Sequence, residues 1–166
     1  MTGTTASLAE RFRRATDDVV DFVSGLSDAQ WRAVDAAEGL SIGAMVHHLA
    51  AGDRLARGVL ETLAQGADRA SRQTEVATED RERLQAQEAA EFAHLGRTET
   101  IEMLRRQGAD VARTISGLSD PELERVHTLW GESVRTREFI ERWIEDIGQH
   151  LAEIRATADK QSRSRT

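Results

Sequence analysis

Between residues 136 and 158 the apolar side chains recur every three or four positions, a spacing that an amphipathic helix produces and a strand does not. The apolar positions are Phe139, Ile140, Trp143, Ile144, Ile147, Leu151 and Ile154. Such a stripe must be buried, and helices bury their stripes against one another. Similar stripes occur over residues 7–24, 42–65 and 98–116. The sequence therefore predicts an all-α fold, an up-and-down four-helix bundle.

Two related segments link the predicted long helices. GLSDAQWRAV at 25–34 returns as GLSDPELERV at 117–126. In each copy a glycine ends one helix, and the serine that follows has Gln30 or Glu122 three positions later, which is the arrangement of a capping box. We therefore expect a short connecting helix after each glycine. Residues 65–78 are mostly small and polar, which predicts a linker or a surface loop.

Two further breaks are expected in the second half of the chain. The apolar face of residues 79–116 changes phase near Gly96, which predicts a break there, with Thr98 as the cap of the helix that follows. Residues 126–135 are expected to form a loop, in which Trp130 could form the wall of a pocket.

The composition is typical of one soluble domain. The chain has 166 residues, 39% apolar and 31% charged, so residues 1–166 are expected to form a single domain with its core at about 7–158 and a disordered tail at 159–166. No cysteine occurs, which excludes disulfides, thiolate metal ligands and a cysteine nucleophile. The net charge of −7 is spread over mixed acidic and basic residues, so no nucleic-acid partner is expected. The lack of a long apolar run predicts a cytoplasmic protein with no membrane partner.

Asp146 and His150 stand four positions apart, so their side chains lie beside each other on one helix face. The pair lies at the edge of the apolar stripe and is expected to point partly inward. Such an orientation costs desolvation unless a hydrogen bond or a metal ion compensates for it. A metal site would need a third ligand. His48 lies on the flank of the stripe at 42–65 and is expected to face inward, while His47 is expected to face solvent.

The same three residues have a simpler interpretation, as one partly buried histidine and one ordinary hydrogen-bonded pair. His94 and His127 are expected at the surface. Asp53 falls on the apolar side of its helix, where it could orient a metal ligand, although pairing with an arginine is the commoner case. Trp31 and Trp143 are expected in the core.

Three stretches of the chain carry a likeness to a known family. They are LSDAQWRAVDAAEGLSIGAMVHHLA, EFAHLGRTETIEMLRRQGADVARTISGLSDPELERV and EDIGQHLAEI. Together they resemble the DinB-like superfamily, and within it the branch similar to the N-terminal domain of mycothiol-dependent maleylpyruvate isomerases. The resemblance spans about residues 7–158 and rests on order and spacing. It implies a four-helix bundle that holds a divalent metal on His48, Asp146 and His150, and it implies a homodimer.

The resemblance also implies a chemistry. Two imidazoles and one carboxylate leave open positions on a divalent ion, as in catalytic metal sites. Such an ion, Zn²⁺ or alternatively Ni²⁺ or Fe²⁺, can lower the pKa of a bound water or thiol. The expected function is metal-dependent transfer or isomerisation of a small-molecule substrate with a low-molecular-weight thiol such as mycothiol. A metal-dependent hydrolase on the same scaffold and a non-catalytic ligand-binding bundle are the alternatives.

Overall fold

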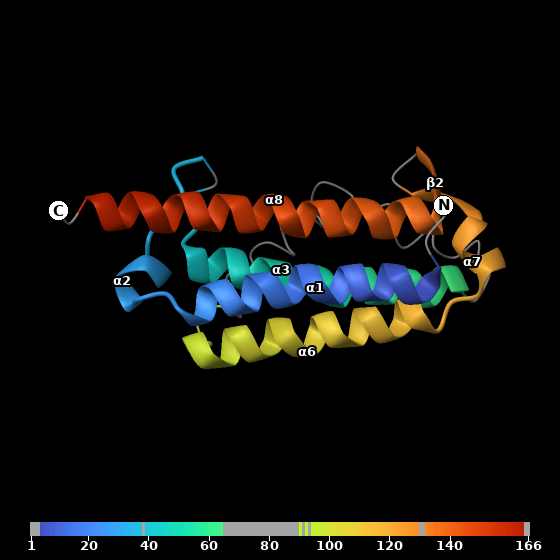
Figure 1. The fold of residues 1–166 in the computed structure, drawn as a ribbon, viewed down its shortest axis with the longest axis horizontal. Coiled ribbons are helices and arrows are strands. Elements are labelled where there is room, and N and C mark those ends of the chain that lie inside the picture. The colour runs from blue at the N-terminus through green and yellow to red at the C-terminus, as the bar shows by residue number, and fades with distance from the viewer. Residues whose placement is uncertain are drawn as a thin grey trace.

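Long helices make up most of the protein (Figure 1). The computed structural model describes residues 4–37, 39–64, 90, 92, 94–129 and 132–164. In chain order the elements are α1 (Thr5–Ser24), α2 (Asp28–Trp31), α3 (Ile42–Ala64), α6 (Arg97–Ser116), α7 (Asp120–Glu124), β1 (Val126–Leu129), β2 (Glu132–Arg135) and α8 (Thr136–Arg163). The predicted all-α bundle is confirmed, because the described strands form only one two-stranded sheet. The linker predicted at 65–78 lies outside the described residues.

The long helices begin and end close to the predicted positions, with one exception. α8 continues past Ala158 to Arg163, so residues 159–163, which we expected to be disordered, are helical. The last turns of α8 have partners that hold them: Ala158 is buried, and Nε2 of Gln30 in α2 donates a hydrogen bond to Oγ of Ser162 (3.2 Å). No helix in the described part of the chain is both long enough and apolar enough to cross a membrane.

The two related segments form the short helices that the sequence predicts. At α2 the backbone N–H of Gln30 donates to Oγ of Ser27 (3.3 Å), and Oε1 of Gln30 accepts from the Ser27 N–H (2.9 Å). At α7 the backbone N–H of Ser119 donates to Oε2 of Glu122 (2.7 Å). These reciprocal bonds satisfy N–H groups that the first helical turn leaves without partners.

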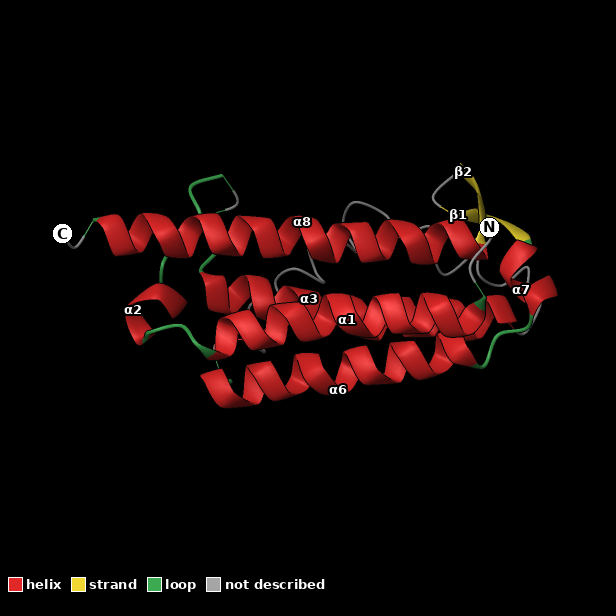
Figure 2. Ribbon diagram, viewed as in Figure 1, coloured by secondary structure: helices red, strands yellow, loops and turns green. Residues whose placement is uncertain are grey.

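Two local predictions were wrong. α6 is capped at Gly96 instead of Thr98, because the carboxylate of Glu99 accepts the Gly96 N–H (2.7 Å) and so supplies the cap. The segment at 126–135, expected to be a loop, contains the antiparallel pair β1 and β2 at one end of the bundle (Figure 2). β-Branched residues favour strands, and one of them, Val134, packs into the core. Trp130 lies outside the described residues.

The direction of one helix corrects the up-and-down prediction. α1 and α8 run one way and α3 and α6 run the other way (Figure 1). Nη2 of Arg97, at the start of α6, donates to the carbonyl of Val23 at the end of α1 (2.9 Å). Nη1 of Arg125, just after α7, donates to the carbonyl of Leu63 at the end of α3 (3.1 Å). Directions therefore do not alternate at α3 and α6, which run parallel to each other.

The interfaces between the helices differ in closeness. α6 packs closely on α1 and α3, whereas α8 approaches α1 and α3 less closely. Gly108 permits the close approach of α6 to α1, since a Cβ at this position would lie 2.5 Å from Cγ2 of Thr16. α8 carries two aromatic side chains one turn apart, Phe139 and Trp143, whose ring centres lie 6.1 Å apart. The candidate site residues lie along the interface between α3 and α8.

Candidate functional site

His48 on α3 and His150 on α8 meet across the α3–α8 interface. Their ring centres lie 5.8 Å apart, with the rings nearly perpendicular at 81°. His48 is exposed and the side chain of His150 is 21% exposed, so the pair lies at the open edge of the interface. The fold therefore brings together two predicted ligands from opposite halves of the chain, although His48 does not face inward as we expected.

Two carboxylates flank the His150 ring. Oδ2 of Asp146 lies 3.7 Å from Nε2, and Oε2 of Glu153 lies 3.1 Å from Nδ1. A carboxylate at Nδ1 accepts a proton held there and directs the lone pair of Nε2 to the other side. Sequence reasoning did not find Glu153, although its position three residues after His150 places it on the same helix face. The side chain of Asp146 is 51% exposed, so it points less inward than the apolar pattern indicated.

These residues fit a divalent cation in donor chemistry. Imidazole and carboxylate are ligands that Zn²⁺ and similar ions accept, and two imidazoles on one tetrahedral ion place their ring centres about 5 Å apart. The 5.8 Å between His48 and His150 is close to that spacing. Across the described residues, no three histidine or carboxylate side chains converge on one point as they stand. Asp146, which is exposed, would have to turn toward the histidine pair to complete the set.

His47 lies on the opposite side from the one predicted. It is 2% exposed, and its ring centre lies 5.7 Å from that of Phe92. The apolar stripe suggested a narrow buried face, but α3 packs against both α6 and α8 and is buried over a wider arc. His47 falls within this arc and His48 at its edge, which reverses the expected orientation of the two histidines.

Asp53 on α3 is fully buried and belongs to the same α3–α8 interface as the histidine pair. Its Oδ1 accepts a hydrogen bond from Nε1 of Trp143 on α8 (3.1 Å), and within the described structure Oδ2 has no hydrogen-bond partner. Burial raises the pKa of the Asp53 carboxyl to about 7, against a smaller lowering by the Trp143 hydrogen bond. The prediction that Asp53 pairs with an arginine is therefore wrong, because its partner is the indole of Trp143.

His94 and Trp31 lie where they were expected, whereas His127, which was expected at the surface, is partly buried. His94 is exposed, and Trp31 is buried beneath the guanidinium of Arg97, which lies 5.4 Å from the ring centre. His127 is partly buried, and its Nε2 lies 3.1 Å from Oγ1 of Thr136. Burial lowers the pKa of His127, with a further contribution from the charge of Arg125.

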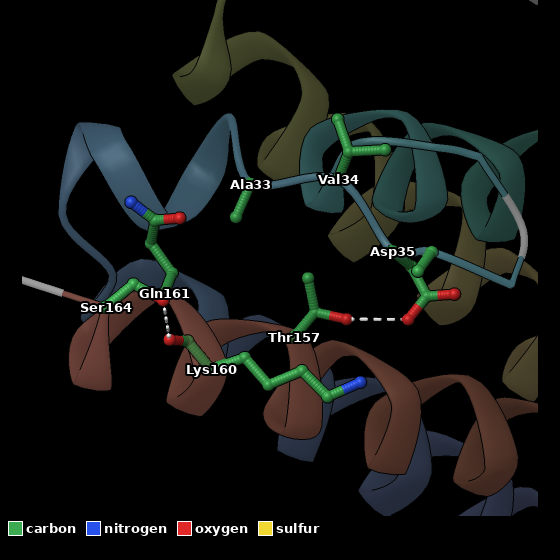
Figure 3. A pocket seen from close by; sticks show the side chains of 8 residues that line it. Ala33, Val34, Asp35, Thr157, Lys160, Gln161 and Ser164 are labelled. Atoms are coloured by element: carbon green, nitrogen blue, oxygen red, sulfur yellow. Dashed lines mark hydrogen bonds between the residues drawn. The ribbon is translucent and has the colours of Figure 1, made fainter.

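A hollow of about 110 Å³ lies where the connection between α2 and α3 meets the end of α8 (Figure 3). Its buried polar groups bond to each other. Oγ1 of Thr157 donates to Oδ2 of Asp35 (2.9 Å), and the backbone N–H of Ala37 donates to Oδ1 (2.8 Å). Lys160 also lines the hollow, so the lining contains charges of both signs. We interpret these hydrogen bonds as a structural contact that joins the α2–α3 connection to α8.

Fold and geometry together define a class: a four-helix-bundle protein with a candidate divalent-metal site on facing helices. The chain belongs to the DinB superfamily, whose family model matches residues 11–154. This range includes His48, Asp146 and His150, and it confirms the resemblance at the level of the superfamily. A search of curated proteins gives no match.

Proposed function

We propose that this chain is a metal-dependent enzyme of the DinB-like type, in which His48, Asp146 and His150 hold a divalent cation between α3 and α8. Zn²⁺ is the cation that we expect, with Ni²⁺ or Fe²⁺ as alternatives, because each accepts imidazole and carboxylate ligands. The observation that carries the proposal is the 5.8 Å approach of the His48 and His150 rings from two separate helices. Membership of the DinB superfamily supports it.

Each residue of the proposed site has its own task. His48, His150 and Asp146 bind the cation, and Glu153 keeps the proton of His150 on Nδ1 so that Nε2 is available as a ligand. When bound, the cation would supply Lewis acidity and lower the pKa of a coordinated thiol or water. His48 is exposed and His150 is partly exposed, which gives a small molecule access to the site.

The proposed reaction is the transfer or isomerisation of a small-molecule substrate with a low-molecular-weight thiol such as mycothiol. The likeness to the N-terminal domain of mycothiol-dependent maleylpyruvate isomerases supports a thiol cosubstrate. The absence of cysteine is compatible with it, because any thiol chemistry on this chain must use a thiol from outside.

Metal binding is the first test. Zn²⁺ titrated into the metal-free protein should bind at one equivalent, and His48→Ala or His150→Ala should abolish most of this binding while leaving helix content intact. Glu153→Gln should weaken affinity about 10- to 100-fold, as loss of a carboxylate behind a ligating histidine usually does. Equal Zn²⁺ binding by the parent and His48→Ala would refute the proposal.

The matched control is His94→Ala, which removes an exposed histidine outside the α3–α8 interface and should leave Zn²⁺ binding unchanged. His47→Ala is unsuitable as a control, because His47 is buried and its loss should lower stability. If the three ligands were only an ordinary helical pair and a lone histidine, the parent would bind no stoichiometric metal. Asp146→Ala and His150→Ala would then lower stability modestly and to similar extents.

Turnover by the metal-loaded protein separates the classes of function. A reaction that requires added mycothiol supports transfer or isomerisation. Turnover of a substrate without any thiol supports the metal-dependent hydrolase instead. Stoichiometric metal with neither activity supports a ligand-binding bundle without catalysis.

A further inference from the structure

Trp143 of α8 is held against α3 at two neighbouring residues. Its Nε1–H donates to Oδ1 of Asp53 (3.1 Å). The edge of its six-membered ring lies against Gly52, where an added Cβ would lie 3.0 Å from Cζ2 and 3.3 Å from Cη2 of the indole. A side chain at position 52 would therefore require the ring to shift by a few tenths of an ångström. The position of the indole therefore depends on two features of α3: Gly52 has no side chain, and Asp53 supplies a hydrogen-bond acceptor.

The indole lies on the same strip of the interface as the histidine pair. Gly52 follows His48 by four positions and Trp143 precedes His150 by seven, and both spacings return to the same face of a helix. His48 and His150 face each other, so the indole is displaced from His48 by about one helical turn, or roughly 6 Å. Leu55 lies on this face of α3 as well and is 53% exposed.

The burial of Asp53 is costly for the bundle. The residue is fully buried, it receives one hydrogen bond, and its Oδ2 has no partner in the described structure. A buried polar atom without a partner destabilises a protein, and an apolar residue of similar size would avoid that cost. What the carboxyl provides at this position is a fixed orientation for the Trp143 indole.

We infer that Trp143 is the wall against which the carbon skeleton of a metal-bound thiol packs, and that Asp53 is the positioning residue that orients this wall across Gly52. The ligand is a small thiol with an aromatic or aliphatic group next to the sulfur. Its sulfur reaches the histidine pair while its skeleton lies on Trp143 and Leu55. This inference rests on the proposed function, because it requires a cation between α3 and α8.

The test compares two thiols on protein loaded with Co²⁺, whose bond to a thiolate gives a charge-transfer absorption band. Benzyl mercaptan and 2-mercaptoethanol both lose a proton to the buffer on binding, and only the first carries an aromatic group. The parent should bind benzyl mercaptan about tenfold more tightly than 2-mercaptoethanol, since burying an aromatic group is favourable. Trp143→Leu should reduce this ratio to about threefold or less.

Asp53 is tested by a pair of substitutions. Asp53→Leu should reduce the ratio as Trp143→Leu does, because the indole loses its acceptor. Asp53→Asn should preserve the ratio, because the amide Oδ1 still accepts the indole N–H. All three variants should bind Co²⁺ within about twofold of the parent. The matched control is Val126→Ala, which shortens an exposed apolar side chain on β1 and should leave the ratio unchanged.

The outcomes separate this inference from the proposed function. A parent that binds no Co²⁺ through His48 overturns both. A parent that binds Co²⁺ and both thiols, with a ratio that Trp143→Leu or Asp53→Leu leaves unchanged, overturns the inference alone. Loss of Co²⁺ binding in Asp53→Leu overturns the positioning role as well. If circular dichroism shows that Trp143→Leu does not fold, the comparison of Asp53→Leu with Asp53→Asn decides.

Discussion

At the scale of single residues, Asp53 links the stability of the bundle to pH. Burial raises the pKa of its carboxyl from 3.8 to about 7, so between these values the folded protein binds a proton that the unfolded chain has lost. The stabilising contribution is complete below pH 3.8 and is lost as the pH rises toward 7. We therefore predict that Asp53→Asn, which cannot ionise, becomes more stable relative to the parent over this range, by at most about 4 kcal/mol.

Urea unfolding of both proteins at pH 4, 5, 6, 7 and 8 measures this difference. Subtracting the free energy of unfolding of the parent from that of the variant cancels the titration of all other groups. The difference should increase up to about pH 7 and then level off. A difference that stays constant with pH would show that Asp53 titrates normally.

Thr157 and Asp35 make a second buried polar contact, which joins α8 to the connection between α2 and α3 (Figure 3). Thr157→Val keeps the size of the side chain and removes the hydroxyl that donates to Asp35. We predict a loss of about 1–3 kcal/mol in the free energy of unfolding. The control is Thr62→Val, because the partly buried Thr62 donates to the carbonyl of Gly58, which lies in the same helix. An equal loss of stability from both substitutions would contradict a stabilising role for the buried hydrogen bond between Thr157 and Asp35.

At the scale of helices, the α1–α6 interface depends on the absence of a side chain at Gly108. A Cβ there would lie 2.5 Å from Cγ2 of Thr16, so Gly108→Ala should force the two helices apart and destabilise the protein by about 1–3 kcal/mol. Gly58→Ala places the same methyl group on α3 where nothing lies within 4 Å, and it should stabilise the protein by about 0.5–1 kcal/mol. Thermal unfolding followed by circular dichroism distinguishes these opposite signs. Stabilisation by Gly108→Ala would contradict this prediction, because it would show that the α1–α6 interface accommodates the added methyl group.

At the scale of the whole molecule, we propose that the protein is a homodimer, which is what the family resemblance implies. Sedimentation equilibrium at micromolar concentration should then give twice the chain mass of 18.4 kDa. The same experiment with His48→Ala should also give a dimer, because the proposed metal site lies within one chain. A monomer at all concentrations would remove the proposal.

Local patterns in the amino-acid sequence were sufficient to predict the four long helices and both short ones. The spacing of apolar residues and the caps at Ser27 and Ser119 act over one or two turns, so neighbouring residues carry the information. The same locality explains the errors. Gly96 competed with Thr98 as a cap, and the short strands at 126–135 depend on pairing with each other and on a contact of Val134 with the core.

The partners of the site residues were decided by how the helices pack. Local spacing placed Asp146 beside His150, but it did not reveal that α3 is buried over a wide arc, which places His47 inside and His48 at the edge. The offset between α3 and α8 gave Asp53 an indole partner instead of an arginine. Helix direction and offset depend on side chains that are far apart in the sequence, and a periodic pattern specifies which face is apolar but not which neighbour covers it.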